Sequence, residues 1–211
     1  MQAGDPLGMA DELNGKTIAF LLANSGVEQV ELTTPWQAVE DAGGTPVLVA
    51  PEKGTVQAFT NDVEKADTFE ADRAVADVSA GDFDGLVLPG GTTNPDSLRQ
   101  DSDAVALVAA FAAAGKPIAA ICHGPWTLVE AGVVRGKTLT SWPSLQTDIR
   151  NGGGEWVDEE VVVDELCLTI VPMLTGGDAL RIATGADLDV ALRPALLLEQ
   201  DGTLLGRWLV D

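Results

Sequence analysis

Cysteine and histidine, which often mark disulfide-rich or metal-binding proteins, are scarce in this chain of 211 residues. Its two cysteines, Cys122 and Cys167, are too few for a disulfide framework, and this favours a reducing, cytoplasmic setting. There is no CxxC pair, no cluster of histidines and no zinc-ligand spacing. We therefore expect no metal site and no cofactor.

Long apolar segments are also missing. Residues 1–14 contain neither the basic region nor the apolar region of a secretory signal, so none is expected. The longest apolar run, residues 104–114, is too short to span a bilayer. The sequence thus predicts a protein without a membrane partner.

Basic residues are few, because 12 Lys and Arg face 33 Asp and Glu and the net charge is −21. Such a surface repels phosphate backbones, so nucleic acid is not an expected partner. We interpret the charge as a solubilising surface, with a cationic partner as the alternative. Hydrophobic residues make up 45% of the chain, enough for one domain with an ample core.

Short apolar runs alternate with helical patterns along most of the chain. Strands are expected at 17–22, 46–50, 86–88 and 118–121. Helices are expected at 32–42, with Pro35 in the first turn, and at 104–114, while 23–28 is expected to be a loop and 55–70 a turn or hairpin. This alternation predicts a parallel sheet covered on both faces, and ligands bind such sheets beyond the carboxyl ends of the strands.

The motif with the clearest chemistry is Cys122-His123, at the point where a predicted strand turns into a predicted helix. A helix N-terminus and a nearby imidazole both favour the thiolate, so we expect a low-pKa nucleophile on a strained elbow. His123 is the only histidine and suits a general base or acid, with its ring expected to point away from the thiol. The alternatives are a buried structural cysteine and a histidine that only caps the turn.

A series of short stretches, in a characteristic order and spacing, gives the chain a family resemblance. The stretches are residues 23–24, 27–32, 86–91, 120–125, 131–137, 140–143, 154–158 and 161–164. Through them, residues 15–164 resemble the PfpI-type intracellular protease family of the class I glutamine amidotransferase-like superfamily. The resemblance implies a flavodoxin-like three-layer α/β/α sandwich with a mainly parallel sheet and Cys122 as nucleophile.

The resemblance also assigns partners to the thiol. It implies that Glu31 lies against Cys122 and carries a raised pKa, since desolvation and like charge both favour the protonated carboxyl. Glu28 is the alternative for this role, and an ordinary acidic helix start is the alternative interpretation of Glu31.

Two backbone amides and a further acid complete the implied site. The N–H groups of Gly91 and His123 would form an oxyanion hole, with Gly90 in the same substrate-binding turn. In oligomeric members of the family, an acid from a neighbouring subunit acts on the histidine. Asp96 occupies the matching position here, although an aspartate after Asn-Pro also suits a turn or helix cap.

The resemblance stops at residue 164, so we predict domains at 1–164 and 165–211. The second segment is expected to be atypical and β-rich, and residues 165–174 and 196–210 are similar to the tail of riboflavin-pathway pyrimidine reductases, which have a dihydrofolate-reductase-like fold. Only a tail is present, so no working reductase is expected. Cys167 is expected to be a packed core residue, and Gly176-Gly177 a turn.

These observations predict a cytoplasmic, homo-oligomeric cysteine hydrolase or lyase of the PfpI type. Its substrate would be a peptide bond, or a reactive aldehyde and its protein adducts, as in the deglycase and glyoxalase members of the superfamily. A strict glutamine amidotransferase is disfavoured because no second histidine exists. The alternatives are a redox-responsive stress protein that is oxidised at Cys122 and an inert fusion fragment.

Overall fold

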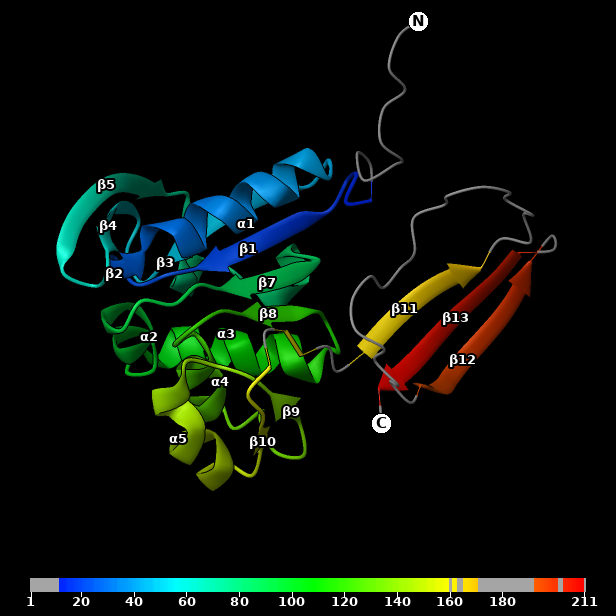
Figure 1. The fold of residues 1–211 in the computed structure, drawn as a ribbon. Helices are drawn as coiled ribbons and strands as arrows, with labels where there is room; N and C mark the ends of the chain where they lie inside the picture. The colour runs from blue at the N-terminus through cyan, green and yellow to red at the C-terminus, as the bar shows by residue number, and fades with distance from the viewer. Residues whose placement is uncertain (1–11, 160, 163–164, 171–191, 201–202, 211) are drawn as a thin grey trace, which may run out of the picture. The chain divides into compact units, whose positions relative to one another are not determined.

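The computed structural model describes residues 12–159, 161–162, 165–170, 192–200 and 203–210 (Figure 1). The chain divides between Asp158 and Glu159 into two units, a few residues before the boundary predicted at 164. Within the described ranges, no helix combines the length and apolarity needed to cross a membrane.

The first unit is built on a five-stranded sheet in the order β6-β3-β1-β7-β8. Its strands are β1 (Thr17–Leu21), β3 (Thr45–Ala50), β6 (Arg73–Ala74), β7 (Gly85–Leu88) and β8 (Ile118–Ala120). Every neighbouring pair in this sheet is parallel. The prediction of a flavodoxin-like α/β fold with a mainly parallel sheet is therefore confirmed.

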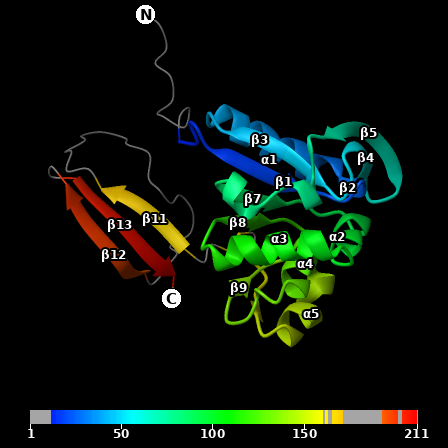
Figure 2. The same ribbon diagram turned by 180° about the vertical axis from the view of Figure 1, so that it is seen from behind.

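Helices cover both faces of the sheet, with α1 and α3 on opposite sides (Figures 1 and 2). The helices are α1 (Gln29–Asp41), α2 (Thr93–Leu98), α3 (Ser102–Ala113), α4 (Pro125–Glu130) and α5 (Gln146–Asn151), with short 3₁₀ turns η1 (Val75–Asp77), η2 (Ala80–Asp82) and η3 (Pro143–Leu145). Successive residues of β1 point to opposite faces: Leu21 packs in the same cluster as Phe111 of α3, and Phe20 in the same cluster as Leu32 of α1. Because β1 packs against a helix on each face, the first unit has three layers: helix, sheet and helix.

Two small sheets flank the main one. In the first, β2 (Ser25–Glu28), β4 (Gly54–Thr60) and β5 (Glu64–Ala71) pair in the order β2-β4-β5. The hairpin expected at 55–70 is confirmed, since β4 and β5 form it. The prediction of a loop at 23–28 is wrong for residues 25–28, which form β2. In the second, β9 (Thr138–Leu139) pairs with β10 (Glu155–Trp156).

The helix boundaries follow local chemistry. Asp101 caps α3 by accepting hydrogen bonds from the N–H groups of Asp103 and Ala104 at 3.0 and 2.9 Å. The helix predicted at 104–114 is therefore confirmed, although it begins at Ser102. Helix α1 begins at Gln29, earlier than the predicted residue 32, and Pro35 consequently lies inside it rather than in its first turn. Because proline has no N–H, the carbonyl of Glu31 receives no helical bond from position 35.

The second unit contains an antiparallel sheet in the order β11-β13-β12. Its strands are β11 (Glu165–Ile170), β12 (Leu192–Gln200) and β13 (Thr203–Val210), and the register of β12 shifts between Pro194 and Leu196. The described residues within 165–211 form strands, and the separate domain predicted for this segment stays a prediction. Its likeness to a reductase tail stays a prediction, and the predictions for the Cys167 side chain and for Gly176-Gly177 lie outside the described residues.

Candidate active site

The candidate nucleophile lies beyond the carboxyl end of β8. Cys122 has a left-handed φ of 55°, and Pro125 starts α4 three residues later. The turn between them has no room for a side chain at Gly124, where a Cβ would overlap the carbonyl oxygen of Leu88. The strand, strained turn and helix form the elbow that the sequence predicts.

The thiol is held in a desolvated, acidic environment. Burial, the charge of Glu31 and a hydrogen bond to Glu31 together raise the pKa of Cys122 to about 12. The N–H groups of His123 and Gly91 hydrogen-bond to the sulfur and oppose this rise. The prediction of a lowered pKa for Cys122, from a helix N-terminus and an imidazole, is therefore wrong. Burial and the carboxylate of Glu31 raise this pKa by more than the N–H groups lower it.

Glu31 projects from the first turn of α1 toward the thiol. Its Oε2 accepts a hydrogen bond of 2.7 Å from the N–H of Gly90. Burial raises its pKa, with smaller contributions in the same direction from the charges of Glu28 and Asp62. The direction predicted for Glu31 is confirmed, and since the pKa of its thiol partner is also raised, the pair retains a proton at neutral pH.

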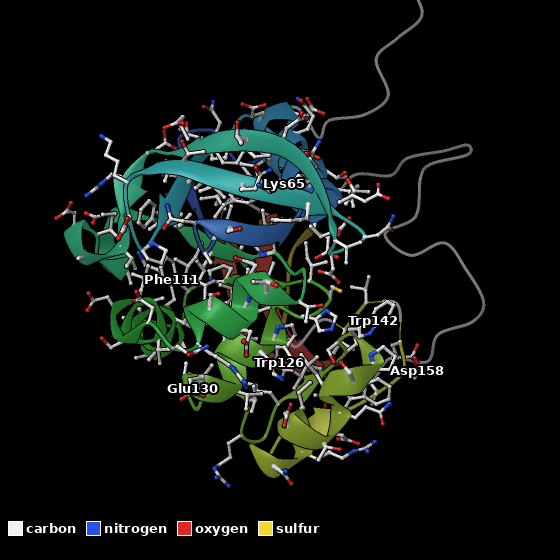
Figure 3. The ribbon with its side chains drawn as sticks, turned by 90° about the vertical axis from the view of Figure 1, so that its left-hand side faces the viewer. Lys65, Phe111, Trp126, Glu130, Trp142 and Asp158 are labelled. Carbon is white, nitrogen blue, oxygen red and sulfur yellow. The ribbon has the colours of Figure 1, made fainter. Side chains whose placement is uncertain are left out.

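His123 is buried against the thiol, with its Nδ1 3.2 Å from the Sγ of Cys122. The expectation that the ring points away from the thiol is thus wrong. The rings of Trp126 and Trp142 lie 5.6 and 5.8 Å from the imidazole, and both tryptophans are labelled in Figure 3. Burial lowers the pKa of His123, so the imidazole is neutral at neutral pH and can accept a proton.

The Gly90–Gly91 turn lies against both the thiol and Glu31. A Cβ on Gly90 would stand 2.5 Å from Oε2 of Glu31 and 2.8 Å from the Cβ of Cys122. Gly91 has a φ of 77°, and a Cβ there would overlap the carbonyl oxygen of Gly26. Glycine at both positions lets the Gly90 N–H reach Glu31 and the Gly91 N–H reach the sulfur.

Asp96 lies on α2 and has a partner within its own chain. Its Oδ1 is 2.9 Å from Nη2 and 3.0 Å from Nε of Arg99. The guanidinium of Arg99 in turn lies over the ring of Trp126, 4.9 Å from its centre. A role for Asp96 in a neighbouring subunit stays a prediction.

Asn94, a fully buried polar residue beside the site, was not predicted from the sequence. Its Oδ1 accepts a 2.6 Å hydrogen bond from the N–H of Ala23, and its Nδ2 donates to the carbonyls of Pro89 and Gly90 at 2.9 and 3.1 Å. Asn94 thus ties the end of β1 to the glycine turn. The sequence signal, an Asn-Pro after a glycine pair, indicates only a turn.

Replacing Asn94 by alanine is expected to lower the free energy of unfolding by about 2 kcal/mol, because three buried backbone groups lose their partner. Asn24→Ala is the matched control, since Asn24 also bridges backbone groups, those of Glu52 and Thr55, but at an exposed position. Urea denaturation measures both variants. An equal loss in the two would contradict the burial argument.

Asp62 was also missed, and it approaches the site from the β4–β5 turn, where its carboxylate accepts hydrogen bonds from Thr92. Across the described residues, no group of three or more His, Cys, Asp or Glu side chains is arranged to hold a metal ion. The carboxylates of Glu31 and Asp62 each accept a hydrogen bond from a backbone N–H, those of Gly90 and Thr92. The arrangement is that of a nucleophile flanked by an acid and a base.

Comparisons with known proteins identify the family of the chain. The family model of the DJ-1/PfpI family matches residues 16–171. A deglycase of Pyrococcus horikoshii is 40% identical over 148 residues, covering 70% of this chain and 84% of the deglycase. A candidate cysteine protease of Bacillus subtilis is 37% identical over 154 residues, covering 73% of this chain and 88% of the relative.

Among solved structures, a two-domain protein of Anabaena variabilis has a DJ-1/ThiJ/PfpI-like and a ferritin-like domain. It matches with a TM-score of 0.64 and 31% identity, over 71% of this chain and 41% of that protein. The family model covers well over half of the chain, and the curated relatives are matched over most of their length. The chain therefore belongs to the DJ-1/PfpI family.

Proposed function

We infer that this protein is a cysteine-dependent enzyme that acts on reactive aldehydes and on their adducts with protein amines and thiols. The observation that carries the proposal is the grouping of Cys122, Glu31 and His123, with a 3.2 Å separation between Sγ and Nδ1. A sulfur nucleophile with a proton acceptor and a proton donor beside it suits addition to a carbonyl carbon.

The chemistry begins with the sulfur of Cys122. Its thiol proton passes to the hydrogen-bonded carboxylate of Glu31, and the sulfur forms a C–S bond to the carbonyl carbon while the carbonyl electron pair moves to oxygen. The N–H groups of Gly91 and His123 already hydrogen-bond to the sulfur, and a carbonyl carbon bound there would bring its oxygen within reach of them. Protonated Glu31 then supplies this proton to the adduct oxygen, and the neutral imidazole of His123 moves the C–H proton of the former aldehyde carbon to the adjacent carbonyl carbon. Water hydrolyses the resulting thioester to a hydroxy acid and restores the thiol.

The substrate class rests on the relatives. Those most similar in sequence include a protein named deglycase, which supports carbonyl adducts as substrates. Another relative is named as a candidate cysteine protease, and the same nucleophile could attack a peptide carbonyl. Aldehyde carbons are the more electrophilic of the two, so a thiol whose ionisation is opposed by burial suits them better.

The test compares three substrates with one purified protein. We expect loss of methylglyoxal, followed by its absorbance, and release of free amine from a methylglyoxal-treated lysine derivative, while a fluorogenic peptide is cleaved slowly or not at all. Cys122→Ala serves as the blank because it removes only the sulfur. Both reactions should vanish in this variant.

The outcomes separate the alternatives. Cleavage of the peptide that exceeds turnover of both carbonyl substrates would overturn the deglycase proposal in favour of a peptidase. The absence of any turnover that depends on Cys122 would overturn the enzyme proposal and favour a protein that senses oxidation at this thiol.

A further inference from the structure

The tip of the β4–β5 hairpin forms an unusual link to the candidate active site. Asn61 and Asp62 both have left-handed backbones, with φ of 52° and 63°, as in the tightest hairpin turns. The N–H groups of both residues donate to the carboxylate of Glu28, each at 3.1 Å. Glu28, the alternative acid in the sequence analysis, thus holds the turn in place.

The Asp62 side chain reaches from this turn to the loop that contains Gly91. Its Oδ1 accepts a 2.6 Å hydrogen bond from the N–H of Thr92, and its Oδ2 accepts one of 2.9 Å from the Thr92 hydroxyl. Thr92 directly follows Gly91, whose N–H bonds to the Cys122 sulfur. Two carboxylates therefore connect β2, the hairpin tip and the glycine turn in series.

We propose that Asp62 is a positioning residue for the reaction proposed above: its carboxylate fixes the Gly90–Thr92 loop so that the Gly91 N–H points at the reacting atoms. Asp62 performs this role within a single chain. The paired hydrogen bonds to the main chain and side chain of one residue fix both the place and the rotation of the loop. The inference rests on the proposed function.

The charge of Asp62 also acts on both titrating partners of the thiol. It raises the pKa of His123 against the lowering by burial, and together with Glu28 it raises the pKa of Glu31. Two further charged side chains contact Trp126, whose ring packs against the imidazole: Arg99, which is paired with Asp96, and Asp148, which accepts the indole N–H. Removing the charge of Asp62 should therefore move both limbs of a pH–rate profile toward lower pH.

Two substitutions separate position from charge. Asp62→Asn removes the charge but keeps an oxygen for the Thr92 N–H, whereas Asp62→Gly removes both the charge and the hydrogen bonds. Glycine suits the left-handed turn, so the second variant is expected to fold. Asp67→Asn is the matched control, because Asp67 is a carboxylate of the same hairpin that instead pairs with Gln29.

The expected result is a loss in kcat of about 10- to 100-fold for Asp62→Gly, since losing one oxyanion donor outright costs about 10²- to 10³-fold. Asp62→Asn should keep kcat within about threefold of the wild type and shift the profile to lower pH. Equal kcat values for Asp62→Gly and Asp62→Asn would overturn the proposal. So would wild-type kinetics in Asp62→Gly.

A readout without substrate distinguishes failure of this inference from failure of the proposed function. Alkylation of Cys122 by iodoacetamide depends on the thiolate, which the Gly91 N–H stabilises. Asp62→Asn and Asp62→Gly lack the same charge, so a slower alkylation of Asp62→Gly at one pH reports the lost positioning. Equal alkylation rates in the two variants would overturn the inference even if no substrate is found.

Discussion

Substituting Cys122 by serine is expected to lower turnover of an aldehyde substrate by at least about 10³-fold while leaving the fold intact. Serine keeps the size and the hydrogen-bond geometry of the site, and the N–H groups of Gly91 and His123 would then face a hydroxyl. An alcohol is a far weaker nucleophile than a thiol beside the same imidazole. The measurement is kcat/KM for methylglyoxal together with the thermal midpoint.

The strained backbone at Cys122 provides a second, independent expectation from the same position. Its φ of 55° is unfavourable for any residue with a Cβ. Cys122→Gly should therefore be more stable than Cys122→Ala by roughly 1 kcal/mol, although both are inactive. Equal unfolding free energies for these two variants would mean that the elbow stores no strain. For the serine variant of the first prediction, turnover within tenfold of the wild type would show that the reaction does not need the thiol of Cys122.

Sequence patterns predicted those parts of the fold that depend on local composition. The apolar run at residues 17–22 is typical of a strand buried on both faces, and β1 occupies most of it. An aspartate before an alanine-rich run is likewise typical of a helix N-cap, and Asp101 caps α3 in the structure. The short β2 was missed because Ser25-Gly26 resembles a turn until β4 pairs with it.

The candidate site could be predicted only in part, because its energetics depend on residues distant in sequence. The elbow at Cys122 is local and was predicted, whereas Glu31 meets the Gly90 amide across 59 positions. The family resemblance supplied Glu31, but the direction of the Cys122 pKa was wrong because burial has no local signature. Asn94 and Asp62 resemble ordinary turn residues in sequence, and only the folded chain gives them their partners.

Replacing Glu31 by glutamine is expected to have opposite effects on activity and stability. Turnover should fall by about 10²- to 10⁴-fold, because glutamine cannot transfer the proton that the adduct needs. The amide oxygen can still accept the Gly90 N–H, so the glycine turn should stay in place. The buried carboxylate and its repulsion by Glu28 and Asp62 are removed, and the variant should therefore be more stable at neutral pH.

The pH dependence of this gain follows from the pKa of Glu31, which burial raises in the folded state. The folded wild-type protein holds this proton more tightly than the unfolded chain does. Its stability therefore falls as the pH rises from the unfolded value of about 4.3 through the folded pKa, and the penalty is complete above that. Glutamine does not titrate, so the advantage of Glu31→Gln should be largest at neutral pH and disappear in acid.

Urea denaturation at several pH values measures this advantage, and the exposed Glu40→Gln on the same helix is the matched control. Glu40 lies far from the thiol along α1, so its variant should match the wild type in both stability and turnover. A stability gain in Glu31→Gln that is independent of pH would show that the carboxylate charge is not its source. Lower stability at neutral pH would mean that the hydrogen bonds of Glu31 outweigh its desolvation. If Glu31→Gln is more stable than the wild type at neutral pH, as expected, then the buried carboxylate of Glu31 destabilises the fold. Its presence is then explained by its role in the reaction.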